Sequence, residues 1–279
     1  MTWKNNRAAS FAVIAIVYIV TAALGVCLYR SNHHAWWLNL LLVDVACTLF
    51  IYIFSVVLNN ASVYDPYWSV QPPVILLGLA VGVPLTVPRL LMLIAVAFWG
   101  VRLTANWAYT FRGLSHQDWR YTMLRKQTGA AYPLINLIGI HMVPTLIVWA
   151  CTLPAAYLFI FDVSAWVGSW LSFVLCLGAT TLQLVADMQM HRFRKKGEGG
   201  LIRDGLWKYS RHPNYLGEIL MWWGVALAVG RWSLCLGAAA NTLLFLCVSI
   251  PMAEKRQSEK EGYAEYKKQT HMLFPLKGR

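Results

Sequence analysis

Charged residues are scarce in this chain, and acidic ones are the scarcest. Only 13% of its 279 residues are charged, with 12 Asp and Glu against 24 Lys and Arg, while 58% of the residues are hydrophobic. One soluble core could not bury that much apolar surface, so the composition excludes an ordinary globular domain and predicts a bilayer as the solvent. The net charge of +12 does not indicate nucleic-acid binding, because the basic residues lie in short segments between apolar runs.

The chain also lacks the cysteine patterns of disulfide-rich and metal-binding proteins. Its six cysteines include no Cys-x-x-Cys pair, have no His at ligand spacing, and lie inside or at the ends of apolar runs. We interpret them as small packing residues and expect no metal site. No internal repeat or linker divides the sequence. We therefore expect one membrane domain, with substrate-side helices in residues 1–130 and cofactor-binding helices, loop and tail in residues 131–279.

Long apolar runs are what the sequence has in abundance. They cover residues 11–28, 38–58, 74–87, 90–107, 134–161, 166–187, 215–229 and 234–250. Most can cross about 30 Å of hydrocarbon as helices. We expect an all-α, polytopic integral membrane protein with seven or eight transmembrane helices around an intramembrane cavity and a cytosolic cofactor site. The count depends on 74–87, which contains Gly82 and Pro84, and on the short run 215–229.

The positive charge is concentrated in residues 112–126, residues 191–211 and the tail from Lys255 onward. By the positive-inside rule, these three segments share the cytosolic face. Eight full spans then put the N-terminus in the cytosol, and seven put it outside. The first apolar run follows a short basic segment like that of a signal sequence, but no small-x-small cleavage site follows it, and we expect a retained helix.

Ionisable residues within the apolar runs are candidates for function, since at membrane depth they cost several kcal/mol unless they are paired or hydrated. Asp44, Arg102, Asp187 and Glu218 meet this description. For Asp44 and Arg102, a structural ion pair or snorkelling towards the interface explains the position equally well. The neighbours of Asp187 and Glu218 favour a functional site.

Those neighbours form a basic, glycine-rich loop that opens an apolar helix. Pro213 fits the first helical position, so Arg194, Arg211 and the helix N-terminus can converge on phosphate oxygens. Asn214 and Glu218 lie four residues apart on one helix face, where they suit amide and ribose hydroxyl groups. The alternative is a positive-inside loop before a span, but such a loop needs no acid in the helix.

The tail adds a second set of polar residues. Its charges alternate at helical spacing, which by itself is typical of a solvated amphipathic helix along the membrane face. Glu254 and Arg256 come directly after the last apolar run. They can therefore close the phosphate site from the opposite side.

The residues of the basic loop and the tail together resemble the pattern of a known protein family. Residues 205–218 read Gly-Leu-Trp-x-Tyr-x-Arg-His-Pro-Asn-Tyr-x-Gly-Glu, after Asp187, Arg194 and Gly197-Glu198 and before Glu254-x-Arg256 and Tyr263-x-x-Tyr266. In these positions the chain resembles a bacterial member of the steroid 5-alpha-reductase family, whose wider relatives include sterol reductases and isoprenylcysteine carboxyl methyltransferases. The resemblance is strong over about residues 187–275 and fainter over 102–119.

The resemblance implies a multi-span fold, with seven helices in the reductases, that holds NADPH near the cytosolic side. The nicotinamide would point into an intramembrane cavity that an apolar substrate enters from the lipid. Asp187, Arg194, Asn214 and Glu218 match cofactor-binding positions of the reductases, and Arg112 and Arg256 match less closely. The complete set of expected cofactor contacts is Arg112, Asp187, Arg194, Arg211, His212, Asn214, Tyr215, Glu218, Glu254 and Arg256.

The N-terminal half departs from the family pattern. The reductases hold the substrate ketone with a Gln-Glu pair and a Tyr, and this chain has no such pair. In the corresponding stretch, Asp65 with Tyr64 or Tyr67 is expected to serve in its place. The alternative is that Asp65 caps the following helix among interfacial aromatic residues.

The expected activity is NADPH-dependent reduction of the 4,5 double bond of a 3-oxo-4-ene steroid or a similar apolar enone, in steroid or lipid metabolism. A carboxylic acid or phenol would hydrogen-bond the ketone while hydride adds to the β carbon. One alternative is a membrane methyltransferase using S-adenosylmethionine, since that branch shares the Arg-His-Pro-Asn-Tyr motif; another is a non-catalytic lipid-binding or transport protein. The expected setting is a bacterial inner membrane, with an apolar substrate and membrane lipids as partners.

Overall fold

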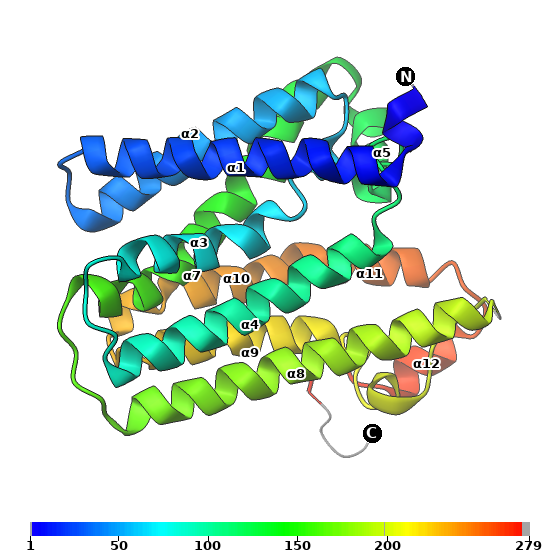
Figure 1. Cartoon of the computed structure of the whole chain (residues 1–279). Coiled ribbons are helices and arrows are strands. Elements are labelled where there is room, and N and C mark those ends of the chain that lie inside the picture. The colour runs from blue at the N-terminus through cyan, green and yellow to red at the C-terminus, as the bar shows by residue number, and fades with distance from the viewer. Residues whose placement is uncertain (1, 198, 275–279) are drawn as a thin grey trace.

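In the computed structural model, which describes residues 2–197 and 199–274, long helices run side by side along one direction (Figure 1). The helices are α1 (Arg7–Ser31), α2 (Trp36–Val57), α3 (Tyr67–Ala80), α4 (Val87–Thr110), α5 (Trp119–Thr128), α6 (Tyr132–Ile135), α7 (Val143–Ile160), α8 (Val167–Lys196), α9 (Pro213–Leu227), α10 (Leu236–Leu244), α11 (Ile250–Gln257) and α12 (Tyr263–Gln269). The described residues form no β-strand, and one isolated bridge joins Ser210 to His271. The all-α prediction is confirmed.

Short segments connect these helices. Single 3-10 turns lie at η1 (Thr2–Asn5), η2 (Ala61–Val63), η3 (Gly129–Ala131), η5 (Gly205–Lys208) and η6 (Trp232–Leu234). Two π-helical segments, η4 (Asn136–Met142) and η7 (Phe245–Ser249), continue α6 into α7 and α10 into α11. As a result, Trp119–Ile160 and Trp232–Gln257 are each an unbroken helical run.

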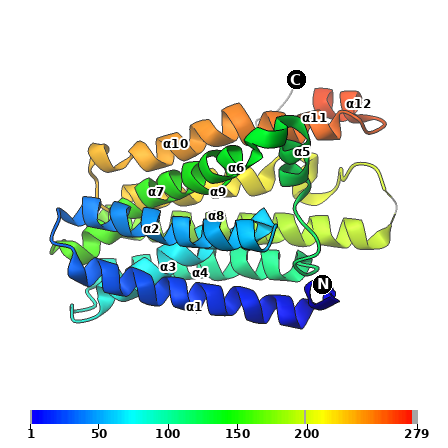
Figure 2. The ribbon, with the colours of Figure 1, turned by 90° about the horizontal axis from the view of Figure 1, so that it is seen from above.

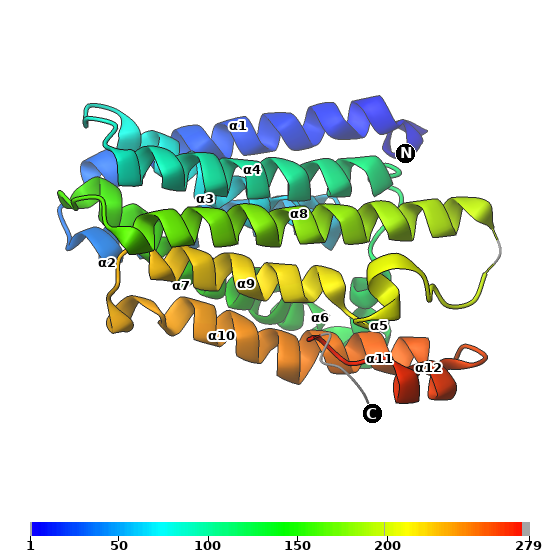
Figure 3. The ribbon, with the colours of Figure 1, turned by 90° about the horizontal axis from the view of Figure 1, so that it is seen from below.

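The chain is a multi-pass membrane protein. Within the described ranges, six helical segments are long and apolar enough to cross a membrane: α1, α2, α4, Trp119–Ile160, α8 and Trp232–Gln257. The remaining two passes, α3 and α9, have 14 and 15 residues and run alongside the long helices (Figures 2 and 3). Counting them, the described chain runs from one end of the bundle to the other eight times, which returns both termini to the same end.

The three basic segments meet at that same end, which we call the basic end. The Arg211 side chain pairs with Glu254 at 2.7 Å, and Arg256 lies over the Trp119 ring at 4.3 Å. The N-terminus is there too, since Lys4 Nζ donates to the Leu58 carbonyl at 2.6 Å. The expectation that the basic segments share one face is therefore confirmed.

The third apolar run is displaced from its expected position. The expected segment was 74–87, whereas α3 covers Tyr67–Ala80 and residues 81–86 form the turn before α4. Gly82 adopts a φ of +82° in this turn, and Pro84 cannot continue a helix hydrogen-bond ladder. Hydropathy located the apolar residues, but backbone chemistry decided where the helix ends.

The tightest helix pair is α8 with α9 (Figure 3). A Cβ on Gly217 would lie 2.7 Å from the Ala179 carbonyl, and one on Gly224 would lie 2.6 Å from Cys176 Sγ. Glycine at these two positions lets the backbones approach closely, as in other membrane helix pairs. This contact fixes the start of α9 beside the C-terminal half of α8 at the basic end.

Candidate functional site: a basic cavity and an apolar cavity

A polar cavity of about 520 Å³ opens at the basic end, and we call it the basic cavity. Its walls come from α4, α5, α8, α9, α11, α12 and the loop between α8 and α9. Figure 3 shows α8, α9, α11 and α12 converging in this region. Of the expected cofactor contacts, seven line this cavity: Asp187, Arg194, Arg211, His212, Asn214, Tyr215 and Arg256.

The wall between α8 and α9 is fastened to the tail. The Tyr266 hydroxyl donates to the Trp207 carbonyl at 2.6 Å, and the backbone N–H of Arg211 donates to the His271 carbonyl at 2.9 Å. Arg211 Nε also donates to Glu254 Oε1 at 2.8 Å. Arg211 therefore holds the loop between α8 and α9 against the tail, and Glu254 neutralises the charge of Arg211.

Three other cations face the basic cavity without an acidic partner within ion-pair distance in the described part of the chain: Arg194, Arg256 and Lys260. Burial lowers the pKa of Lys260, and repulsion from Arg194 and Arg256 lowers it further. The three side chains therefore repel one another. An anion bound between them would remove this repulsion.

His212 closes the inner wall as a neutral side chain. It is buried, its ring stacks on Tyr215 with centroids 5.3 Å apart, and Nε2 makes no hydrogen bond. Glu254 Oε1 lies 3.5 Å from Nε2, yet burial lowers the pKa of His212 to about 4. The burial cost outweighs the nearby carboxylate, so His212 adds no charge to the cavity near neutral pH.

Beyond Asn214, a buried polar network continues into the bundle. Glu218 accepts hydrogen bonds at 2.9 Å from both Trp99 Nε1 and Trp222 Nε1. Arg102 pairs with Asp187 at 2.8 Å and lies 3.9 Å from Glu218. Glu218 does not line the basic cavity but lies one helical turn further along α9 than Asn214.

Two other expected contacts also lie outside the cavity wall. Arg112 is exposed at the end of α4 and lines no described cavity. Glu254 supports the wall through Arg211 and Lys267 instead of facing the cavity. Glu198, part of the sequence motif, and Pro275, the last residue of the resemblance, lie outside the described residues.

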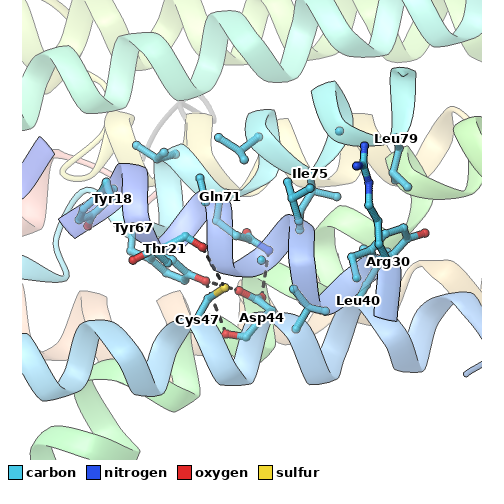
Figure 4. A pocket seen from close by; sticks show the side chains of 18 of the residues that line it. Tyr18, Thr21, Arg30, Leu40, Asp44, Cys47, Tyr67, Gln71, Ile75 and Leu79 are labelled. Carbon is cyan, nitrogen blue, oxygen red and sulfur yellow. Dashed lines mark hydrogen bonds between the residues drawn. The ribbon is translucent and has the colours of Figure 1, made fainter. Parts of the chain in front are cut away.

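A second cavity of about 220 Å³ lies between α1, α2 and α3, and we call it the apolar cavity. It carries three linked polar side chains, Asp44, Tyr67 and Gln71 (Figure 4). The Tyr67 hydroxyl donates to Asp44 Oδ1 at 2.6 Å, and Gln71 Nε2 donates to Asp44 Oδ2 at 2.9 Å. Asp44 is only 3% exposed, and no described cation lies within ion-pair distance of it. Burying a carboxyl group without a cation costs free energy, so its presence here indicates a functional role.

Sequence reasoning found this site only in part. It named Tyr67 as a candidate and noted Asp44 as a costly residue, but it did not join the two and it missed Gln71. The available signal was the acid within the second apolar run. What could not be seen was that α2 and α3 turn these side chains towards each other across the helix pair.

Tyr64 and Asp65 lie elsewhere. The Tyr64 hydroxyl is 2.6 Å from Thr145 Oγ1, and it donates to the His141 carbonyl at 2.9 Å. Asp65 accepts from the Tyr121 hydroxyl at 2.6 Å, and burial raises its pKa to about 7 although Arg120 and Tyr121 oppose the shift. Neither residue lines the apolar cavity or the basic cavity.

The two cavities share no described lining residue. The contact between α3 and α4 separates them: Ser69 Oγ lies 2.8 Å from Thr104 Oγ1. A Cβ on Gly100 would lie 2.5 Å from the Ser69 carbonyl and 2.6 Å from Pro73 Cγ, so the helix backbones nearly touch there.

The sequence of the chain matches one known protein family. Residues 51–270 match the family described as "Protein of unknown function (DUF1295)". The chain belongs to this family. The match includes the described walls of the basic cavity as well as Tyr67 and Gln71, but it begins after Asp44.

Individual relatives confirm the expected resemblance to steroid 5-alpha-reductases. Proteins named 3-oxo-5-alpha-steroid 4-dehydrogenase 1 from Mus musculus, Macaca fascicularis and Homo sapiens are 33%, 32% and 32% identical over 107, 108 and 108 residues. Each match covers 37% or 38% of this chain and 40% of the relative, so this chain spans about two fifths of the length of those relatives. No solved structure matches the chain.

Proposed function

We propose that this member of the DUF1295 family is a membrane oxidoreductase that uses NADPH to reduce an apolar enone, such as a 3-oxo-4-ene steroid. The observation that carries the proposal is the basic cavity, where Arg194, Arg256 and Lys260 face one another without acidic partners in the described chain. The partial similarity to proteins named 3-oxo-5-alpha-steroid 4-dehydrogenase 1 supports the reaction class. We further propose a bacterial inner membrane, with the basic end in the cytosol.

The residues of the basic cavity fit a phosphorylated dinucleotide. Guanidinium and ammonium groups are the usual partners of phosphates, and the start of α9 adds backbone donors and a positive dipole end. Asn214, in the first turn of α9, is placed to hydrogen-bond an amide or a ribose hydroxyl. The volume of about 520 Å³ falls within the range of cofactor sites, roughly 300–1,000 Å³. When bound, NADPH supplies the hydride.

At the substrate, the proposed catalytic residue is Tyr67, and Asp44 and Gln71 position it. The Tyr67 hydroxyl faces an apolar cavity, where a hydrogen bond to a ketone oxygen is strengthened by the exclusion of water. As charge builds on that oxygen, the phenol stabilises the enolate that forms when hydride adds to the β carbon. Asp44 accepts from both Tyr67 and Gln71 and so holds the phenol in place beside the cavity.

The α3–α4 contact limits how this reaction can occur. With Ser69 and Thr104 hydrogen-bonded and Gly100 against Pro73, a substrate in the apolar cavity is walled off from the basic cavity. The proposed reaction therefore requires α3 and α4 to separate near Tyr67 when both ligands are bound. Movements of this kind that complete a site on ligand binding are common in enzymes.

The first test is NADPH binding and NADPH oxidation by the purified full chain with progesterone or testosterone. We expect NADPH to bind, and Arg194→Ala to weaken it by about 10–100-fold, as for loss of a charge-assisted phosphate contact. Binding of S-adenosylmethionine without NADPH would replace the proposal with the methyltransferase. Binding of steroid without NADPH oxidation in any enone tested would favour a lipid-binding or transport protein.

Two Asp→Asn variants separate the catalytic assignments. Asp44→Asn should lower turnover by about 100-fold or more while NADPH binding stays normal, because the Tyr67 phenol loses its acidic partner. Asp65→Asn removes the acid expected from sequence and should leave turnover within about threefold, because Asp65 lines neither cavity. The reverse result would return the catalytic role to Asp65 with Tyr64.

A further inference from the structure

The apolar cavity has two chemically different polar regions. Asp44, Tyr67 and Gln71 form a polar group between Tyr18 and the middle of the cavity, and Arg30, in the last turn of α1, lies at the far end (Figure 4). Between the two regions the wall is aliphatic, formed by Leu40, Val43, Val70, Val74, Ile75 and Leu79. A ligand that fills this cavity meets hydrogen-bonding groups first, then hydrocarbon, and finally a permanent positive charge.

The cavity is elongated along α1. Gln71, in the polar group, and Leu79, at the Arg30 end, both line it and are separated by eight positions of α3. At 1.5 Å of rise per residue, this separation corresponds to roughly 12 Å. A rigid molecule several fused rings long, with a short side chain, matches that length.

The polar group of Asp44, Tyr67 and Gln71 has hydrogen-bonding capacity to spare. Gln71 is 7% exposed and lines the cavity, and its Oε1 atom has no hydrogen-bond partner. Buried polar atoms are rarely left unpaired in folded proteins. Because an amide oxygen only accepts hydrogen bonds, this unpaired atom points to a hydrogen-bond donor of a ligand, such as a hydroxyl group.

Arg30 is available at the outer end. It makes no hydrogen bond to a side chain and no ion pair among the described residues, and it lies in the final turn of its helix. Arg30 of α1 and Leu79 of α3 both line this end of the cavity (Figure 4). An arginine that served only the helix dipole would have no need to line an apolar cavity.

We propose that the apolar cavity binds an elongated, apolar, monoanionic molecule with a polar group at Tyr67 and Gln71 and a carboxylate at Arg30. This rests on the proposed function only for taking the polar group to be an enone carbonyl, which accepts from the Tyr67 hydroxyl. It narrows the substrate class from neutral enones to enones whose far end carries a carboxylic acid. The guanidinium pairs with the carboxylate in bidentate geometry, and the aliphatic wall covers the body between them.

The test compares two probes in binding, without NADPH. The probes are a 3-oxo-4-ene steroid with a carboxylic acid side chain and the methyl ester of the same steroid. Affinities are measured by calorimetry on the full chain in lipid nanodiscs at pH 7.5. We expect the acid to bind about tenfold more tightly than the ester, and Arg30→Gln to abolish that preference without weakening the ester. Arg30→Lys should retain part of it.

Arg231→Gln is the matched control, because Arg231 is another exposed arginine at the same end of the bundle, over the Tyr157 ring and outside the apolar cavity. This variant should keep the preference for the acid. Equal affinity of the two probes for the unmodified protein, no binding of either probe, or equal losses in Arg30→Gln and Arg231→Gln would overturn the proposal. Selective acid binding with no NADPH oxidation would instead overturn the proposed function alone.

Discussion

The apolar cavity and the α8–α9 pair differ in how closely their helices pack. Beside the apolar cavity a Cβ on Gly78 has space, because it would meet nothing within 4 Å. In the α8–α9 pair, Gly217 and Gly224 have none. The loosely packed region around the apolar cavity has room for an apolar ligand. The tightly packed α8–α9 pair fixes the positions of charged side chains.

The charges of the two regions differ in the same sense. Arg102 is paired with Asp187, which lines the basic cavity, and the Arg102 side chain is 4% exposed. Arg30, at the mouth of the apolar cavity, is exposed and unpaired among the described residues. One cation belongs to the scaffold, and the other is free for a ligand.

The strongest test of the contrast is to remove each arginine. Arg102→Leu leaves the Asp187 and Glu218 carboxyl groups buried without their cation, and we expect a loss of about 3–5 kcal/mol in the free energy of unfolding. Arg30→Leu should change it by less than about 0.5 kcal/mol, because an exposed unpaired side chain contributes little. Denaturant unfolding in mixed micelles measures both. Similar losses would show that Arg30 is also structural.

The packing contrast can be tested with one methyl group. Gly217→Ala places a Cβ against the Ala179 carbonyl and should cost about 1–3 kcal/mol, because neither backbone can move away easily. Gly78→Ala should be neutral or stabilising by up to about 1 kcal/mol, since the site is open and alanine favours helix. Thermal unfolding in one detergent compares them. A Gly78→Ala protein as unstable as Gly217→Ala would contradict the difference between the two regions.

His212 gives the tightly packed region a sensitivity to acid. Its folded pKa of about 4 lies below the ordinary value, so the unfolded state binds the proton more readily. The stabilisation is complete above about pH 6.5 and is lost as the pH falls towards 4, by about 2 kcal/mol at pH 5. The unmodified protein should therefore lose stability between pH 7 and pH 5 relative to His212→Asn. Parallel pH profiles would show that His212 is not buried neutral.

Asp65 gives the N-terminal half the opposite sensitivity. Its folded pKa of about 7 is raised, so the folded state retains the proton. Stability from this group is complete below about pH 4 and declines by about 1.4 kcal/mol per pH unit as the pH rises towards 7. Asp65→Asn should flatten that decline in thermal unfolding curves. A variant with the same slope as the parent would place the titrating group elsewhere.

Sequence alone was sufficient for much of the basic cavity because its residues are close together in the chain. Arg194, Arg211 and Asn214 lie within one loop and the helix that follows, so motif spacing brought them together. Lys260 was missed because a lysine in a charge-rich tail carries no local signal. Glu218 was placed at the cofactor by spacing along α9, but Trp99 and Trp222 hold it in a deeper network.

The polar partners in the apolar cavity could not be predicted from the sequence. Asp65 was preferred because it stands beside Tyr64 and Tyr67 in the chain, yet its partner in space is Tyr121. Tyr67 lies against Asp44, which is 23 positions away. Adjacent residues of a turn and helix start point in different directions, so adjacency in the chain is weak guidance there.

Apolar length and charge distribution are local properties of the chain, so they were enough to predict a helical, multi-pass membrane protein with its basic segments at one end. The same local spacing placed Arg194, Arg211 and Asn214 together. Tertiary packing brings Asp44, Tyr67 and Gln71 together, places Arg30 at the far end of their cavity, and puts α3 and α4 between the two cavities. Those facts depend on how helices distant in sequence rotate and pack against one another, which no local pattern specifies.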